Sequence, residues 1–330
     1  MTTSQPLFKD NPFCKLLGID YPIIMAPMFL VSNTEMMIQA LESGITAAFP
    51  ALNYRTDDEF RAAITEIKSK TKKPFGINLI VNKSNIKYKA QLATCVDMDV
   101  DFIITSLGSP EETIKQCKAK GIKVFCDVVD LHFAQKVVDL GADALIAVNA
   151  EAGGHAGNIP LKELISLLKS NFDIPIISAG GVATGKQLKK ALDLGAEAVS
   201  IGTIFIASEE SPVTNDYKQA LVDYGAKDIV RTSNLSGTPL TVVNTPYVQK
   251  VGTKASGLQK FLMKNKRLKK YVKMFVTYRG MKSIEKSAFG ASYKTFYVAG
   301  PTIENIHEIK PLKLIVKTMI EEYEAAEVSS

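Results

Sequence analysis

One histidine stands in a glycine-rich setting, where its imidazole could take part in chemistry. The run 151–157 reads Glu-Ala-Gly-Gly-His-Ala-Gly, and the glycines around His155 leave its ring free to face a ligand. A reference pKa near neutrality suits histidine to act as a general base or a hydrogen-bond donor. A loop histidine with only local hydrogen bonds explains the pattern equally well. Because Glu151 is the only acid close to it in the sequence, we expect no metal ion here.

Two further glycine turns indicate a phosphate site. Gly180 and Gly181 follow one short apolar run, and Gly202 and Thr203 follow the next. Backbone N–H groups can approach an anion closely at such turns because no Cβ intervenes, and the Thr203 hydroxyl can add a hydrogen bond. The alternative is that both segments are merely tight turns. A P-loop site is excluded, since the sequence has no Gly-x-x-x-x-Gly-Lys-Ser/Thr run.

Residues after the first apolar run suggest a surface for a planar ring. Ala26, Pro27 and Met28 come directly after that run, and Phe29 and Tyr54 could extend an apolar wall. Core packing is the commoner use of such side chains and stays open as the alternative. A phosphate cradle beside an apolar wall suggests flavin mononucleotide (FMN). A Rossmann dinucleotide site is not expected, because no Gly-x-Gly-x-x-Gly follows the first run.

The elements that must position these residues alternate between strand and helix over the first two hundred residues. Eight short apolar, β-branched runs predict strands at 22–27, 46–49, 74–80, 102–105, 123–127, 144–148, 174–178 and 198–201. Most are continuously apolar, as strands buried on both faces are. This α/β pattern predicts a TIM (β/α)8 barrel, with a doubly wound sheet as the alternative.

Helical patterns lie between these runs, and part of the sequence repeats weakly. The predicted helices cover 34–43, 57–69, 111–120, 131–140, 161–170 and 184–194. Segments 137–146 and 191–200 resemble each other, and each reads as a helix end, a glycine and the next strand. Glycine at this point can adopt the left-handed conformation that ends a helix. The repeat therefore supports successive βα units.

In a barrel, the chemistry lies at the carboxyl ends of the strands. Asn78 is a polar residue within the third apolar run, Ser106 follows the fourth run, and Asp127 ends the fifth. We count these three, together with Gly154 and Ser178, among the expected cofactor-binding residues.

The pattern changes after residue 211. We divide the chain into a barrel over 1–225 and a mostly helical C-terminal excursion over 226–330. Segments 212–224 and 312–326 read as helices, and 231–246 reads as loop. The excursion either covers the barrel mouth or packs on the barrel's outer side.

Composition places the chain among ordinary globular proteins, with 46% hydrophobic and 22% charged residues. No apolar run is long enough to span a membrane, the N-terminus lacks a signal-peptide pattern, and a cytoplasmic location with reduced cysteines is expected. Residues 250–286 contain twelve Lys or Arg and one acid, Glu285. This basic run is either the solvated face of a helix or a surface that attracts an anionic substrate, carrier or cofactor phosphate. No nucleic-acid-binding pattern accompanies it.

Five runs of this sequence resemble the nitronate monooxygenase (former 2-nitropropane dioxygenase) family, which includes flavin-dependent enoyl-acyl-carrier-protein reductases of type II. They are Ile24-Met-Ala-Pro-Met28, Gly76-Ile-Asn78, Glu151-Ala-Gly-Gly-His-Ala-Gly157, Ser178-Ala-Gly-Gly-Val182 and Ile201-Gly-Thr-Ile-Phe205. The resemblance covers about 12–225 strongly and the C-terminal part loosely.

The resemblance implies an FMN-containing TIM barrel with His155 beside the isoalloxazine ring. By matching position, Ala26, Pro27 and Met28 would line that ring and Asn78 would bond its edge. Gly180, Gly181, Gly202 and Thr203 would hold the phosphate.

This sequence departs from the family pattern at the pocket. Ala156 follows the histidine where relatives often have a larger side chain, and Val148 and Asn149 replace the usual polar residue and glycine. The run Ala299-Gly-Pro301 stands where relatives commonly have Ala-Gly-Gln. These differences leave the substrate open.

Two enzymatic activities are consistent with the resemblance. The first is FMN-dependent oxidation of a nitronate by dioxygen to a carbonyl compound and nitrite, with His155 positioning the nitro group or removing an α-proton. The second is an NAD(P)H-dependent reductase of enoyl-acyl-carrier-protein or quinone type. A non-enzymatic flavin-binding or scaffold protein is a third reading, which the intact His155 loop argues against. The expected partners are a small-molecule substrate and, as candidates, NAD(P)H and a second copy of the chain, without nucleic acid or membrane.

Overall fold

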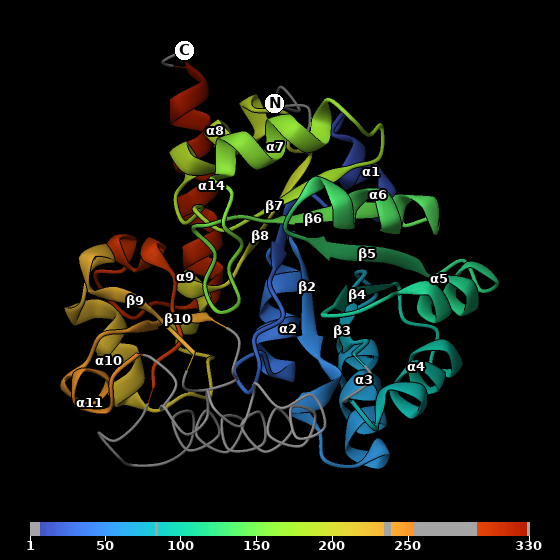
Figure 1. Ribbon diagram of the computed structural model, residues 1–330, viewed down its shortest axis with the longest axis horizontal. Coiled ribbons are helices and arrows are strands. Elements are labelled where there is room, and N and C mark those ends of the chain that lie inside the picture. Colours follow the sequence, from blue (N-terminus) through green and yellow to red (C-terminus); the bar gives the residue numbers. More distant parts are fainter. Residues whose placement is uncertain (1–6, 83–84, 234–238, 254–295, 329–330) are drawn as a thin grey trace, which may run out of the picture.

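Eight parallel strands form a closed barrel in the computed structural model (Figure 1). The structure describes residues 7–82, 85–233, 239–253 and 296–328. The barrel strands are β1 (Ile23–Met25), β2 (Thr46–Pro50), β3 (Gly76–Ile80), β4 (Phe102–Ser106), β5 (Lys123–Val128), β6 (Ala144–Val148), β7 (Ile176–Ala179) and β8 (Ala198–Ile201). Each strand pairs with the next, and β8 pairs with β1. The TIM-barrel prediction is confirmed, and the doubly wound alternative is wrong.

Helices follow the strands and surround the barrel. They are α2 (Thr34–Glu42), α3 (Asp57–Lys70), α4 (Tyr88–Asp97), α5 (Glu111–Lys118), α6 (Leu131–Asp139), α7 (Leu161–Lys169) and α8 (Gly185–Asp193), with the 3-10 turn η1 (Ala51–Asn53) after β2. The six helices predicted between the strands are all present, and their ends agree within about two residues, as is usual for helix boundaries.

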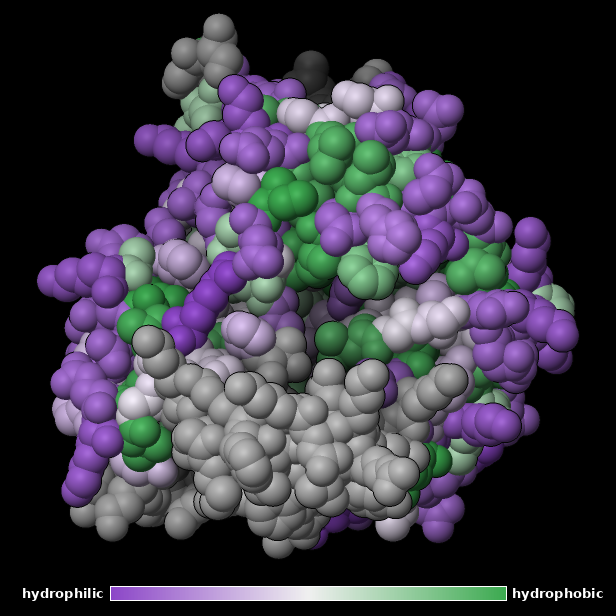
Figure 2. All heavy atoms as spheres, viewed as in Figure 1, coloured by the Kyte–Doolittle hydropathy of each residue, from purple (hydrophilic) through white to green (hydrophobic). Residues whose placement is uncertain are grey.

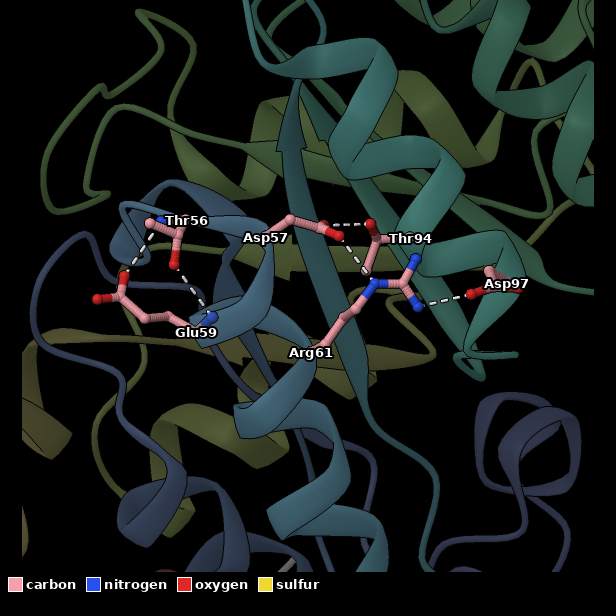
Figure 3. Close-up of polar contacts among 6 residues, drawn as sticks. All are labelled: Thr56, Asp57, Glu59, Arg61, Thr94 and Asp97. Carbon is pink, nitrogen blue, oxygen red and sulfur yellow. Dashed lines mark hydrogen bonds and ion pairs between the residues drawn. The ribbon is translucent and has the colours of Figure 1, made fainter.

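Local hydrogen bonds explain why α3 begins where it does (Figure 3). The Thr56 hydroxyl accepts a hydrogen bond from the Glu59 N–H, and the Glu59 carboxylate accepts one from the Thr56 N–H. This reciprocal pair satisfies two N–H groups that have no partner within the helix. Arg61 then joins α3 to α4, donating to Asp57 at 2.8 Å and to Asp97 at 2.6 Å.

The weak internal repeat has a structural cause at the amino-terminal end of the barrel. Asp143 precedes β6 and accepts a hydrogen bond from the Val124 N–H at the start of β5. Glu197 precedes β8 and accepts one from the Ile176 N–H at the start of β7. The glycine two residues before each acid has a positive φ. The repeated Gly-Ala-acid run therefore ends a helix and caps the neighbouring strand.

Aromatic side chains fill this amino-terminal end. The rings of Phe102 and Phe125 stack with centroids 4.9 Å apart, and Phe13 of α1 (Pro12–Leu17) lies 5.7 Å from Phe125. A Cβ at Gly76 would overlap the ring of Phe102, so glycine is required there. Because this end is packed, a ligand has to enter from the opposite, carboxyl end of the strands.

The C-terminal part contributes both to the mouth and to the outer ring. It contains α9 (Thr203–Ile206), α10 (Asn215–Asp223), η2 (Ala226–Asp228), β9 (Ile229–Thr232), β10 (Leu240–Val243), α11 (Pro246–Val251), η3 (Pro301–Asn305) and α14 (Leu312–Val328). α14 packs against α8 and α2, and thus occupies the place of an eighth outer helix (Figure 1). The expectation of loop over 231–246 is wrong in part, because β9 and β10 form an antiparallel ribbon. The division at residue 225 stays a prediction.

The surface and the cysteines agree with an ordinary globular chain. Figure 2 shows a face on which hydrophilic side chains predominate and hydrophobic ones gather around α6 and α7. All four cysteines are free and buried. No helix in the described ranges is both long and apolar enough to cross a membrane. Most of the basic run 250–286 lies outside the described residues.

Candidate active site

The loop that carries His155 is organised by Asn149, directly after β6. Asn149 is buried, its side-chain amide donates to the Gly180 carbonyl at 3.0 Å, and its Oδ1 accepts from the Glu151 N–H at 2.8 Å. Its backbone carbonyl accepts from the Gly157 N–H at 3.1 Å. These bonds join the His155 loop to the turn after β7. The sequence analysis noted Asn149 only as a departure from the family pattern. A buried amide at a strand end often positions neighbouring loops through its hydrogen bonds.

The ribbon β9–β10 holds the same loop from the other side. The Thr241 hydroxyl accepts from the Gly154 N–H at 2.8 Å, and the Thr241 N–H donates to the Gly154 carbonyl at 2.9 Å. The Arg231 guanidinium donates to the carbonyls of Gly157 at 2.6 Å and Ala150 at 3.3 Å. The ribbon therefore forms hydrogen bonds to the loop on both sides of His155. Sequence reasoning missed both residues, since they lie more than seventy positions away along the chain.

His155 itself keeps an exposed surface within this rigid loop. The surrounding protein removes part of its hydration, and this desolvation lowers the pKa of His155 below its usual value of 6.5. The imidazole is therefore neutral near pH 7, and a neutral imidazole has one acceptor nitrogen. A neutral imidazole at a barrel mouth can remove a proton or accept a hydrogen bond.

The turn after β7 contains the two glycines predicted to bind a phosphate. Gly180 and Gly181 have φ values of 107° and 79°, a region that side chains other than glycine rarely adopt. A Cβ at Gly180 would lie 2.6 Å from Asn149 Oδ1, and one at Gly181 would lie 3.0 Å from Leu161 Cδ1. It would also collide with the Glu151 carboxylate. Neither position has room for a side chain, because protein atoms already occupy the space that a Cβ would fill, so glycine is required at both.

The turn after β8 meets the loop after β1. A Cβ at Gly202 would lie 3.5 Å from Met28 Sδ and 3.7 Å from the Ala26 side chain, so these three residues are neighbours. Met28 and Pro27 are half-buried. The Ser32 hydroxyl fixes the loop by accepting from the Met28 N–H at 3.0 Å. The structure thus brings the predicted wall beside one arm of the predicted cradle.

Thr203 and Ser178 have different surroundings from the glycines. Thr203 is buried, and its Oγ1 accepts from the Gly300 N–H at 3.0 Å, while no acceptor for its own proton is found in the described part of the chain. Ser178 is fully buried, and no hydrogen-bond partner for its hydroxyl is found among the described residues. An unsatisfied buried hydroxyl beneath the mouth is expected where a bound group completes the site.

On the other side of the mouth, three polar side chains from β3, β4 and β5 form a chain. The Asn78 amide donates to Ser106 Oγ at 2.8 Å, and Ser106 donates to Asp127. Burial raises the pKa of Asp127 to about 6, and the hydrogen bond from Ser106 partly offsets this effect. These three predicted residues do come together, although they are far apart in the sequence.

No cysteine contributes to the mouth. Cys126 lies in the core next to Asp127, and the Thr105 hydroxyl donates to its sulfur at 3.2 Å. Burial raises the pKa of the Cys126 thiol to about 12, so the thiol stays protonated and unreactive. Within the part of the chain that the structure describes, no cluster of three or more His, Cys, Asp or Glu could hold a metal ion.

Comparison with known proteins places this barrel in the class of the oxidoreductases. The family model described as nitronate monooxygenase matches residues 10–322. The chain therefore belongs to the nitronate monooxygenase family, whose enzymes are flavoenzymes in general.

Individual relatives are similar at moderate identity. A "(3aS,4S,5R,7aS)-5-hydroxy-7a-methyl-1-oxo-octahydro-1H-indene-4-carboxyl-CoA dehydrogenase" of Rhodococcus jostii is 30% identical over 234 residues, which are 71% of this chain and 65% of that protein. The match thus spans slightly less than two thirds of that relative. A nitronate monooxygenase of Paraburkholderia phytofirmans is 28% identical over 268 residues, covering 67% of this chain and 73% of that protein. The solved structure of FabK from Thermotoga maritima has a TM-score of 0.85 at 29% identity, covering 97% of both chains.

Proposed function

We propose that the mouth of this barrel binds FMN. The support is the turn of two positive-φ glycines, Gly180 and Gly181, after β7, because successive backbone N–H groups in such a turn can bind one phosphate group. Gly202 and Thr203 would complete the cradle, and Ala26, Pro27 and Met28 would face the ring. Asn78, Ser106, Asp127, Gly154 and Ser178 are the remaining candidates for cofactor contacts. The released cofactor should be FMN rather than a dinucleotide, and chromatography of the supernatant after denaturation tests this.

We further propose that the enzyme oxidises nitronates with dioxygen to a carbonyl compound and nitrite. FMN, when bound, supplies the electron acceptor for this chemistry. The observation that carries the proposal is His155, whose lowered pKa keeps the imidazole neutral in a loop held by Asn149, Arg231 and Thr241. A neutral imidazole can remove the α-proton of a nitroalkane, and it can hold the nitro group of a substrate that is already a nitronate.

Two substrates and one variant test this role. His155→Ala should keep its flavin and reduce turnover of the neutral nitroalkane by roughly 10²–10⁴-fold, as expected for loss of proton transfer. Turnover of the preformed nitronate should fall less, because no proton has to be removed. Oxygen uptake and nitrite release measure both rates, and His132→Ala on α6 is the matched control. Equal loss for both substrates would contradict the role as a base.

A second candidate is a reductase or dehydrogenase that acts on an acyl thioester with NAD(P)H as a partner. It is favoured by the match of the whole chain to FabK, an enoyl-acyl-carrier-protein reductase, and by the CoA dehydrogenase among the relatives. In this reaction His155 would orient the substrate. Anaerobic addition of NADH separates the two proposals: rapid bleaching of the bound flavin supports the reductase, whereas nitronate-dependent oxygen uptake without NADH supports the oxidation. A cytoplasmic location and a homodimer stay predictions.

A further inference from the structure

The amide of Asn78 has only one group left for a ligand. Its nitrogen donates to the Ile104 carbonyl at 3.2 Å and to Ser106 Oγ at 2.8 Å, which uses both amide protons. Asn78 is also buried, so its side chain has little freedom to rotate. The carbonyl oxygen is the remaining polar atom, and it can only accept a hydrogen bond.

The direction of this chain of hydrogen bonds is set at its far end. An ionised Asp127 carboxylate has no proton, so it can only accept. The single proton of Ser106 is therefore committed to Asp127, and Ser106 Oγ offers a lone pair to the Asn78 amide. With Asp127 ionised, the amide of Asn78 is held with its nitrogen toward Ser106.

We propose that Asp127 is a positioning residue that acts through Ser106 to make Asn78 a hydrogen-bond acceptor toward the flavin ring. The inference rests on the proposed binding of FMN. Oxidised isoalloxazine carries one N–H group, N3–H, between two carbonyl groups. An acceptor at Asn78 pairs with that N–H and is repelled by the carbonyls, so it fixes which edge of the ring is recognised.

The surroundings of Asp127 make it the only ionisable member of this chain. The neighbouring strands β4 and β6 read Phe-Ile-Ile-Thr-Ser and Ala-Leu-Ile-Ala-Val, and neither contains an ionisable side chain. On β5 itself, burial raises the pKa of the Cys126 thiol to about 12, so Cys126 is neutral. Burial and the Ser106 hydrogen bond alone account for the pKa of Asp127, about 6. Below this pH the protonated carboxyl can donate to Ser106, which releases the constraint on Asn78.

The experiment compares two flavins on the full-length protein after its cofactor has been removed. The dissociation constants of FMN and of N3-methyl-FMN, which lacks the N–H, are measured by quenching of flavin fluorescence. At about pH 7.5 the wild type should bind FMN ~10-fold more tightly than N3-methyl-FMN. This is the affinity expected to be lost when one hydrogen bond is removed and its buried partner is left unsatisfied. Asp127→Asn should reduce this preference to about threefold or less, because an amide can donate to Ser106 and reverse the chain.

A second chain variant and a matched control complete the experiment. Ser106→Ala breaks the same chain and should also lose the preference, which covers the case in which Asp127→Asn fails to fold. Thr105→Val is the matched control, because Thr105 lies on the same strand and bonds Cys126 instead. It should keep the wild-type preference.

The outcomes separate this inference from the proposed function. If the wild type does not bind FMN, the proposed function is wrong and the inference falls with it. If the wild type binds FMN and both chain variants keep the full preference, only the role of Asp127 is overturned. In the wild type the preference should also decline as the pH falls through about 6, and this decline should be absent in Asp127→Asn.

Discussion

The two sides of the barrel mouth offer polar groups of different kinds. On the β6–β8 side most of the candidate groups are backbone atoms of Gly180, Gly181 and Gly202, with the Thr203 hydroxyl beside them, and the side chains of Asn149 and Thr241 hold the loops in place. On the β3–β5 side they are side chains, which run from Asn78 through Ser106 to Asp127.

This difference has consequences for substitution and for pH. A backbone site has fixed geometry and no proton to lose between pH 5 and 8, but it fails when a Cβ is added. A side-chain site tolerates small changes of shape, but its hydrogen bonds depend on the ionisation of one half-buried acid, Asp127.

Gly181→Val should give mostly flavin-free protein. The new side chain would collide with Glu151 and lie against Leu161, which would displace the turn that is proposed to hold the phosphate. Gly121→Val is the control, because Gly121 also has a positive φ, 74°, but has nothing within 4 Å of its Cβ position. It introduces similar backbone strain, ~1–2 kcal/mol, away from the mouth. The ratio of flavin to protein absorbance measures the effect, and a fully yellow Gly181→Val would refute the cradle.

Arg231→Met should lower turnover by about tenfold or more while flavin content stays near that of the wild type. Hydrogen bonds from a charged donor contribute about 1.5–3 kcal/mol each, and their loss loosens the loop around His155. Guanidinium ion added at millimolar concentration should restore part of the activity, which a purely structural defect would not allow.

Arg61→Met provides the control for this variant. Arg61 makes two exposed ion pairs on the outer helices (Figure 3), and such pairs contribute little to stability because solvent screens them. Arg61→Met should leave turnover unchanged. Equal losses in the two arginine variants would show that the ribbon has no special influence on the His155 loop.

Asp127→Asn should stabilise the flavin-free protein at neutral pH. The pKa of Asp127 rises from 3.8 to about 6 on folding, so the folded state favours the neutral acid and ionisation costs stability. The wild type should therefore lose free energy of unfolding as the pH rises from about 4 through 6, by at most ~3 kcal/mol. The variant lacks this loss. Urea unfolding at about pH 4.5 and pH 7.5 measures the free energy of unfolding of the wild type and of the variant. A stability difference between the two proteins that does not grow with pH would contradict the raised pKa of Asp127.

Gly202→Ala should have the smallest effect of the series. Gly202 has a φ of −115°, which alanine adopts without strain, and the added Cβ would lie 3.5 Å from Met28 Sδ, an ordinary contact. We expect a change of no more than about threefold in FMN affinity, or less than ~1 kcal/mol. A loss as large as that of Gly181→Val would mean that both arms of the cradle are equally intolerant of a side chain.

The sequence predicted the barrel because its signals are local. Continuous apolar runs mark strands that are buried on both faces, and each lies close to its predicted position. The ribbon β9–β10 was missed because its strands have four residues each and lie among turn-forming residues. The position of α14 could not be predicted either. Its helical pattern shows an apolar face, but not that this face packs against α8 and α2.

By itself, the sequence determined the βα alternation and the turns of Gly180, Gly181 and Gly202, because strand burial and the absence of a Cβ are properties of a few adjacent residues. It also named Asn78, Ser106 and Asp127 as strand-end residues. Only the tertiary structure decided that these three share hydrogen bonds, since the pairing of β3 with β4 and of β4 with β5 sets their distances. It likewise decided that Arg231 and Thr241 hold the His155 loop. Contacts between residues so far apart depend on closure of the whole barrel, which no local pattern encodes.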